Sequence, residues 1–236
     1  MPSEDSRWGI ILGHCFTCSR HTRVLRDISH GLVDQGFKVL RFDFSGNGQS
    51  EGDFSESFYS KQIDEIKTAV SYMSAREVSW IGLAGHSMGA MVALLAAGEM
   101  DHVRAVCTLA ARASPLDTSH LFNRSQLREL KRKGRVQFTS RGRKLELTEA
   151  FFTDAARYNF PDIVAFLRQP LLVVHGGQDE IISVKDAHRL HQLRPLDTDL
   201  AIIPGADHMF SRDEHRGQVV EQVVRWFKRL AVQDTA

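Results

Sequence analysis

Short apolar runs alternate with longer amphipathic segments along most of this chain, a pattern typical of strand–helix units that build a parallel sheet. Six runs are predicted to be buried strands: 8–13, 38–42, 79–83, 103–109, 171–175 and 199–203. Five segments with helical spacing are predicted to be helices: 20–35, 58–73, 88–97, 183–193 and 218–230. The pattern therefore predicts an α/β fold with a mainly parallel sheet of about six strands flanked by helices.

Residues 111–168 interrupt this alternation. Within them, 136–140 and 144–147 alternate between apolar and polar positions, and the residues between these runs, 141–143, are typical of a turn. We expect a small hairpin here, in an insertion that lies as a lid over one end of the sheet. The predicted organisation is a single domain over 1–236 with the insertion 111–168 inside it.

The composition excludes some partners and indicates a location. The 236 residues carry 30 Lys and Arg against 29 Asp and Glu, a net charge of +1, so no basic field attracts nucleic acid or a membrane surface. The N-terminus is polar, unlike a signal peptide, and three cysteines are an odd number in a chain long enough to fold without disulfides. We expect a cytoplasmic protein without nucleic-acid or membrane partners, either a monomer or a homodimer.

One motif points to chemistry. Residues 85–89, Gly-His-Ser-Met-Gly, fit G-x-S-x-G, the pattern of a sharp strand-to-helix turn that exposes a nucleophilic serine. The pattern alone is weak, but here a predicted strand precedes it and a predicted helix follows it. Glycines at both ends allow a turn so tight that side chains would clash. Ser87 would then lie at a helix N-terminus, where free N–H groups favour negative charge.

A serine hydroxyl needs a base to take its proton and a carboxylate to orient that base. His208 and Asp179 each follow a predicted strand, and the carboxyl ends of parallel strands meet at one edge of the sheet. Together with Ser87 they have the chain order Ser, acid, His. Three other carboxylates remain as alternatives to Asp179: Asp207, Glu180 and Asp117.

Acyl transfer also needs N–H donors for the oxyanion that forms. Met88, the residue after the nucleophile, should supply one, and Phe16, in the loop after the first strand, the other. The Phe16 ring is also a candidate wall of the substrate pocket. Three further residues are candidate substrate contacts: His86, Phe152 and Tyr158. We expect no cofactor and no metal, because Cys15 and Cys18 form a lone C-x-x-C without a second pair.

Several segments together resemble a known family. They are the loop His14-Cys15-Phe16-Thr17, the segment 41–52 (RFDFSGNGQSEG), the motif around Ser87, the His-Gly-x-x-Asp loop ending at Asp179, and Gly205-Ala206-Asp207-His208. The chain resembles the α/β-hydrolase superfamily, in particular its small cinnamoyl/feruloyl-esterase-like, serine-aminopeptidase-like branch. Cys15 stands where that branch usually has glycine, and the insertion matches poorly.

The resemblance implies Ser87 as nucleophile, His208 as base and Asp179 as acid, with Phe16 and Met88 as oxyanion donors. It implies a serine carboxylesterase, and a small lid favours short acyl or aryl esters, including hydroxycinnamoyl esters. A thioesterase, acyltransferase or aminopeptidase with the same Ser-His-Asp triad is the alternative, because fold and triad do not identify the acyl acceptor. A non-catalytic ligand-binding protein of the same fold is the third hypothesis.

Overall fold

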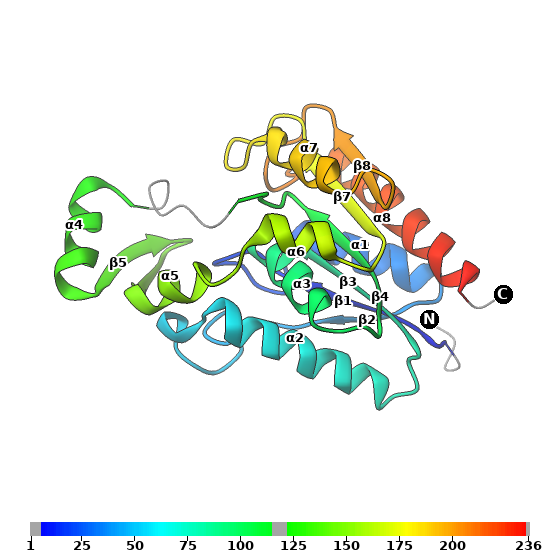
Figure 1. Cartoon of the computed structure of the whole chain (residues 1–236), viewed down its shortest axis with the longest axis horizontal. Coiled ribbons are helices and arrows are strands. Elements are labelled where there is room, and N and C mark those ends of the chain that lie inside the picture. The colour runs from blue at the N-terminus through cyan, green and yellow to red at the C-terminus, as the bar shows by residue number, and fades with distance from the viewer. Residues whose placement is uncertain (1–5, 115–121, 235–236) are drawn as a thin grey trace.

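The computed structural model describes residues 6–114 and 122–234, and its centre is a six-stranded sheet (Figure 1). The strands are β1 (Trp8–Gly13), β2 (Lys38–Arg41), β3 (Trp80–His86), β4 (Val103–Leu109), β7 (Leu171–Gly176) and β8 (Thr198–Ile203). Their order is β2-β1-β3-β4-β7-β8, and every neighbouring pair is parallel. The α/β prediction is confirmed.

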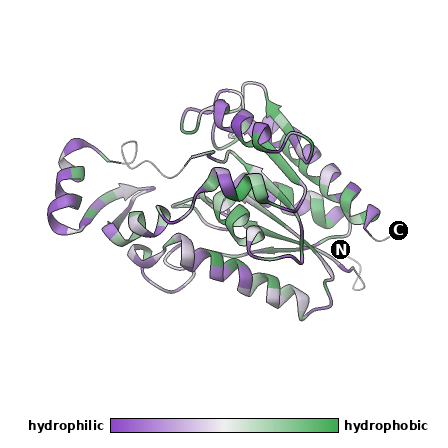
Figure 2. Ribbon diagram, viewed as in Figure 1, coloured by the Kyte–Doolittle hydropathy of each residue, from purple (hydrophilic) through white to green (hydrophobic). Residues whose placement is uncertain are grey.

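Helices cover both faces of this sheet. The helices α1 (Arg23–Asp34) and α8 (Asp213–Gln233) pack on one face. The other face carries α2 (Tyr59–Ser74), α3 (Met88–Gly98), α6 (Phe160–Phe166) and α7 (Val184–Leu193). Successive strand residues alternate between the two cores, as Ile10 and Ile11 do. Helix α3 is almost wholly buried, as its apolar composition predicts, and Figure 2 shows the apolar residues concentrated in the sheet and this helix.

The structure moves several predicted element ends. Strand β3 continues to His86, beyond the predicted end at 83, so it leads directly into the serine turn. Helix α1 begins at Arg23 instead of 20, because the Arg20 N–H donates to Asp43 at 2.6 Å and holds the preceding residues in a turn. Helix α8 begins at Asp213 instead of 218. Its first turn carries two acidic residues, which stabilise a helix N-terminus but interrupt the apolar spacing.

Between β4 and β7 the chain leaves the sheet, over most of the predicted insertion. The elements there are α4 (Arg124–Lys133), β5 (Arg135–Ser140), β6 (Arg143–Thr148), α5 (Glu149–Ala155) and α6. β5 and β6 form the predicted hairpin, and both turn residues have positive φ, 51° at Arg141 and 75° at Gly142. Helix α6, also within 111–168, packs against α3 and α7, so this part of the segment belongs to the main body.

A short 3₁₀ helix, η1 (Phe54–Glu56), lies in the loop between β2 and α2. Within 6–114 and 122–234, no helix has both the length and the hydropathy needed to cross a membrane. Residues 78–98 carry no charged side chain and are about as long as a membrane span, but they form β3 and α3, with Ser87 between them.

Candidate active site

Ser87 lies in a strained turn between β3 and α3. Its backbone has φ 54° and ψ −116°, and its N–H donates to the Leu109 carbonyl at 2.8 Å. The flanking glycines are sterically required: a Cβ on Gly85 would lie 2.2 Å from the Gly89 carbonyl oxygen, and one on Gly89 2.4 Å from the Gly13 carbonyl oxygen. The close approach of α3 to the end of β1 therefore projects Ser87 from the carboxyl edge of the sheet.

His208 and Asp179 lie on two neighbouring loops at the same edge. The His208 Nδ1 lies 2.8 Å from Asp179 Oδ2, and both side chains are almost completely buried. A carboxylate oxygen accepts, so the proton resides on Nδ1 and Nε2 keeps a free lone pair. This is the tautomer that a general base requires.

Three hydrogen bonds and one further histidine contact converge on the Asp179 carboxylate. Besides His208, the N–H groups of Ile181 and Ile182 donate to Oδ1 at 2.9 and 2.7 Å, and His175 Nε2 lies 3.2 Å from Oδ2. Burial raises the pKa of Asp179, but the bonds from His175, His208 and Ile182 outweigh it and hold the pKa well below its usual range. The carboxylate is therefore charged at neutral and mildly acidic pH.

The alternative carboxylates have other partners. Asp207 accepts from the Ser211 N–H at 2.7 Å, and Glu180 accepts from the backbone N–H of His208 at 3.2 Å. Glu180 thus holds the backbone at His208 instead of its ring. Asp117 lies outside the described residues.

Ser87 and His208 line one cavity of about 480 Å³. Within the described residues, no hydrogen bond connects the Ser87 hydroxyl to the His208 ring. Serine–histidine contacts in hydrolases are commonly long before substrate binds, so shared access to one cavity is the relevant observation.

The cavity also presents two unused backbone donors. Phe16 and Met88 both line it, and within the described residues neither N–H donates to a protein acceptor. The Met88 N–H is at the first position of α3, where no helical partner exists. Free N–H groups beside the cavity that holds the serine are the donors that a developing oxyanion requires.

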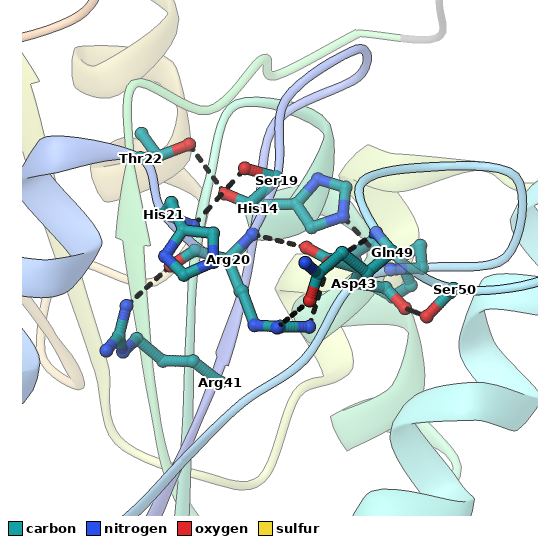
Figure 3. A network of polar contacts seen from close by, with 10 residues as sticks. His14, Ser19, Arg20, His21, Thr22, Arg41, Asp43, Gln49 and Ser50 are labelled. Carbon is teal, nitrogen blue, oxygen red and sulfur yellow. Dashed lines mark hydrogen bonds and ion pairs between the residues drawn. The ribbon is translucent and has the colours of Figure 1, made fainter.

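A polar network supports the loop that carries Phe16 (Figure 3). The His14 Nε2 accepts from the Phe44 N–H at 3.0 Å, so Nδ1 carries the proton and donates to the Cys15 carbonyl at 2.8 Å. That carbonyl belongs to the same peptide unit as the Phe16 N–H. Burial is the main cause that lowers the pKa of His14, so the ring stays neutral. Asp43 belongs to the same network: its Oδ2 lies 2.9 Å from Nη1 of the Arg20 guanidinium.

Of the four predicted substrate contacts, only Phe16 lines this cavity. Its ring stacks on Phe138 of the hairpin, with the centroids 6.1 Å apart. Phe152 and Tyr158 do not line the cavity, because each packs against other aromatic rings of the core. Helical spacing alone does not distinguish a packed aromatic ring from one that faces a cavity.

His86 also does not contact the cavity, and its position indicates another role. It is completely buried, and its Nε2 donates to the His208 carbonyl at 2.8 Å. Burial, with His208 nearby, lowers the pKa of His86 to about 3, so the ring is a neutral donor that holds the His208 loop.

Sequence reasoning missed several cavity walls. Tyr59, Met91, Ile182 and Arg141 line the cavity. Met91 lies four residues after Ser87 on the same side of α3, and Tyr59 begins the helix that follows β2, so both could have been found from the predicted elements. Arg141 reaches the cavity only through the way in which the hairpin docks.

Cys15 and Cys18 are joined in a disulfide, and Cys107 is free and buried. The disulfide corrects the expectation of a chain without such bonds. Within the described residues, no group of three or more His, Cys, Asp or Glu side chains could hold a metal ion.

Comparisons with known proteins show the same fold in characterised structures. Est1E from Butyrivibrio proteoclasticus, solved with ferulic acid, is 26% identical with a TM-score of 0.83, over 98% of this chain and 93% of that one. The esterase domain of a Rhodothermus marinus protein is 28% identical with a TM-score of 0.73, over 97% and 90%.

Curated bacterial relatives are longer than this chain. YqkD of Bacillus subtilis, whose function is uncharacterised, is 26% identical over 79% of this chain, and the match covers 61% of that protein. The chain thus spans about six-tenths of the length of such relatives. The model of the alpha/beta hydrolase family matches residues 10–222. This range includes nearly the whole sheet, the serine turn and the loops of Asp179 and His208. The chain belongs to the alpha/beta hydrolase family.

Proposed function

We propose that this protein is a serine carboxylesterase that forms an acyl-enzyme at Ser87. One observation carries the proposal: the strained Ser87, the Asp179-bound ring of His208 and two unused N–H donors meet at a single cavity. Each is a separate requirement of acyl transfer.

The chemistry follows from these positions. The Ser87 hydroxyl attacks the ester carbonyl while His208 Nε2 takes its proton, and the N–H groups of Phe16 and Met88 stabilise the oxyanion. His208 then gives the proton to the departing alcohol, and the acyl group remains on Ser87. Water then attacks the acyl carbonyl while His208 Nε2 takes one of its protons; the bond to Ser87 breaks, the acid is released, and the ring returns the proton to the Ser87 oxygen. Asp179 stays ionised and stabilises the imidazolium in both steps.

The cavity favours a small, partly apolar acyl or aryl group. A volume of about 480 Å³ lies at the lower end of ordinary ligand pockets, which span roughly 300–1,000 Å³. Its walls include apolar side chains from three parts of the chain: Phe16, Met88, Met91 and Ile182. The similarity to Est1E, solved with ferulic acid, supports including hydroxycinnamoyl esters among the substrates tested.

The central experiment compares wild type with Ser87→Ala on 4-nitrophenyl butyrate. We expect kcat to fall by about 10³-fold or more, because only binding and oxyanion effects remain. A fluorophosphonate probe should label wild type at Ser87 and leave Ser87→Ala unlabelled. An active Ser87→Ala variant, or an unlabelled wild type, would contradict the proposal; the second result would favour a non-catalytic binding protein.

The acceptor is tested with one acyl group presented as an ester, a thioester and an amide. We expect the highest kcat/KM for the ester. A higher value for the thioester or the amide would assign the same triad to a thioesterase or an aminopeptidase, and acyl transfer to an added alcohol in place of water would indicate an acyltransferase.

We also propose a cytoplasmic location, which the odd cysteine count favours. Alkylation under denaturing conditions at the moment of lysis should then modify all three cysteines, because a reducing compartment opens the Cys15–Cys18 disulfide and denaturation exposes the buried Cys107. Modification of Cys107 alone, with Cys15 and Cys18 still paired, would contradict it.

A further inference from the structure

A second cavity, of about 590 Å³, shares a wall with the cavity at Ser87. Four residues line both: Thr17, Cys18, Arg141 and Met209. Met209 directly follows His208, the residue that would protonate the departing alcohol. The second cavity therefore adjoins the proposed reaction centre, next to the loop of the residue that would protonate the alcohol.

The lining of this second cavity is basic. It includes Arg23, Arg141, Arg143, Arg216 and His21, and none of the described lining residues is acidic. Arg216 is neutralised by Asp27, at 2.8 Å, and by Asp213. The other three arginines have no carboxylate partner in the described part of the chain: Arg143 donates to the Gly46 carbonyl at 2.9 Å, and Arg141 contacts the Met209 sulfur at 3.8 Å. In a chain of net charge +1, these three side chains are a local concentration of positive charge.

The N-terminus of α1 adds to this field. Thr22 and Arg23, which begin the helix, line the cavity. The Thr22 hydroxyl donates to the Ser19 carbonyl instead of accepting from the helix, and the first turn holds no acidic residue. Among residues 6–114 and 122–234, no side chain accepts from the first N–H groups of α1, and their partial positive charge favours an anion nearby.

Arg141 is held in place at an energetic cost. With φ of 51° it occupies the first position of a two-residue hairpin turn, where asparagine, aspartate or glycine is usual. Polar contacts on both sides of Arg141 help to dock the hairpin on the body: Ser140 Oγ lies 2.8 Å from Thr17 Oγ1, and Arg143 donates to the Gly46 carbonyl at 2.9 Å. An arginine in an unfavourable backbone conformation, between two cavities, indicates a functional constraint on this side chain.

We propose that the second cavity binds an anionic group, phosphate or carboxylate, carried on the alcohol part of the ester substrate. The proposal rests on the proposed esterase activity and adds to it the class of alcohol. Arg141 and Arg23 are the residues that would recognise the charge, with the N-terminus of α1 behind them. The acyl group would lie in the apolar cavity at Ser87.

The test uses three esters with the same acyl group: 1-butyrylglycerol, its 3-phosphate, and 3-O-butyrylglycerate. At low salt we expect kcat/KM for the phosphate ester to exceed that for the neutral ester by about tenfold, from two or three partly exposed ion pairs. The glycerate ester separates phosphate from carboxylate recognition. At 1 M salt the ratio should fall to about two or less, because the screening length drops to about 3 Å.

The variants are Arg141→Asn, which suits the left-handed turn and so preserves the hairpin, and the double variant with Arg23→Gln. We expect the single change to lower the phosphate-to-neutral ratio by about threefold and the double change to bring it close to one. Lys144→Gln is the matched control: it removes a charge from the same hairpin, at a residue outside both cavities, and should leave the ratio unchanged. A wild-type ratio near one at low salt, or a ratio that the double variant retains, overturns the proposal.

Binding of glycerol 3-phosphate, measured by calorimetry, separates this proposal from the esterase activity. Weaker binding to the double variant than to wild type, without hydrolysis of any ester, would support the anion site and contradict the esterase. Ordinary hydrolysis of the neutral ester, with no binding of glycerol 3-phosphate, would leave the esterase standing and overturn the anion site.

Discussion

His14 should control catalysis without contacting substrate, because its ring orients the peptide that carries a proposed oxyanion donor. The Nδ1–H donates to the Cys15 carbonyl at 2.8 Å, and the Phe16 N–H lies on the other side of the same planar peptide. Glutamine can place an acceptor near the Nε2 position and satisfy Phe44, but it loses the donor to Cys15. Asparagine can keep an N–H donor near the Nδ1 position for the Cys15 carbonyl, but it loses the acceptor for the Phe44 N–H. His14→Gln and His14→Asn are thus a matched pair.

The structure bounds the size of the effect. Complete loss of one oxyanion donor costs about 10²–10³ in kcat. The Cys15 carbonyl also accepts from the Cys18 N–H at 3.0 Å, so the peptide keeps part of its orientation without His14. We therefore expect kcat to fall by about tenfold in His14→Gln and by no more than about threefold in His14→Asn. Changes in KM should be small, because an oxyanion forms only in the transition state.

Stability provides the internal control. His14→Asn leaves the Phe44 N–H unsatisfied and should lower the free energy of unfolding by about 1–3 kcal/mol, whereas in His14→Gln the Cys15 carbonyl still accepts from Cys18 and the loss should be about 0.5–1.5 kcal/mol. The assay is kcat and KM on 4-nitrophenyl butyrate, beside urea unfolding of each variant. Equal kcat values for the two variants, or a more active glutamine variant, would refute the argument that the Nδ1–H positions the Phe16 N–H.

Three further predictions concern the elements that hold the site. Asp179→Asn should lower kcat by about 10³–10⁴-fold with an intact fold, because an amide no longer enforces the Nδ1–H tautomer of His208; steady-state kinetics and thermal melting test this, and near-normal kcat would oppose it. Gly89→Ala should destabilise the protein by about 1–3 kcal/mol and lower activity, because its Cβ would lie 2.4 Å from the Gly13 carbonyl oxygen. Gly98→Ala on the same helix is the control: its Cβ would lie 3.5 Å from Ile163 Cγ2, and the variant should unfold like wild type. Equal melting temperatures for Gly89→Ala and Gly98→Ala would exclude the steric argument. Burial raises the pKa of Asp43, but hydrogen bonds from the N–H groups of Arg20 and Gln49, with the Arg20 charge, lower it overall. This carboxylate therefore stabilises the fold fully above about pH 4, and the contribution is lost as pH falls through the lowered folded pKa. Asp43→Asn should have a lower free energy of unfolding at pH 7 and a shallower decline below pH 4, and parallel curves would count against it.

The local pattern of the chain predicted the sheet well, because each strand is a short apolar run between helices and each helix keeps apolar spacing on one face. The prediction failed where polar contacts outweigh that spacing. Arg20 would extend α1, but its bonds to Asp43 hold it in the turn before the helix. The acidic first turn of α8 and its buried neighbours His215 and Arg216 interrupt the apolar spacing of that helix.

The candidate site divides in the same way. Ser87, Asp179 and His208 could be identified from short motifs next to strand ends, since the sheet brings those ends to one edge. The role of His86 could not be identified in this way. Its position beside Ser87 suggested substrate contact, but at the end of β3 its ring is buried and donates to the His208 carbonyl. Phe152 and Tyr158 were predicted to contact substrate on residue type alone, and the packing of the aromatic core directs them elsewhere.

The sequence by itself determined the α/β architecture, the chain order of nucleophile, acid and base, and the glycines around Ser87, because these depend on local periodicity and on steric limits within a few residues. Only the tertiary structure decided which residues line the two cavities. The hairpin, far from Thr17 in sequence, docks beside it and sets Arg141 between the apolar and the basic cavity. Such a position depends on the packing of segments that share no local pattern, and so no stretch of the chain encodes it alone.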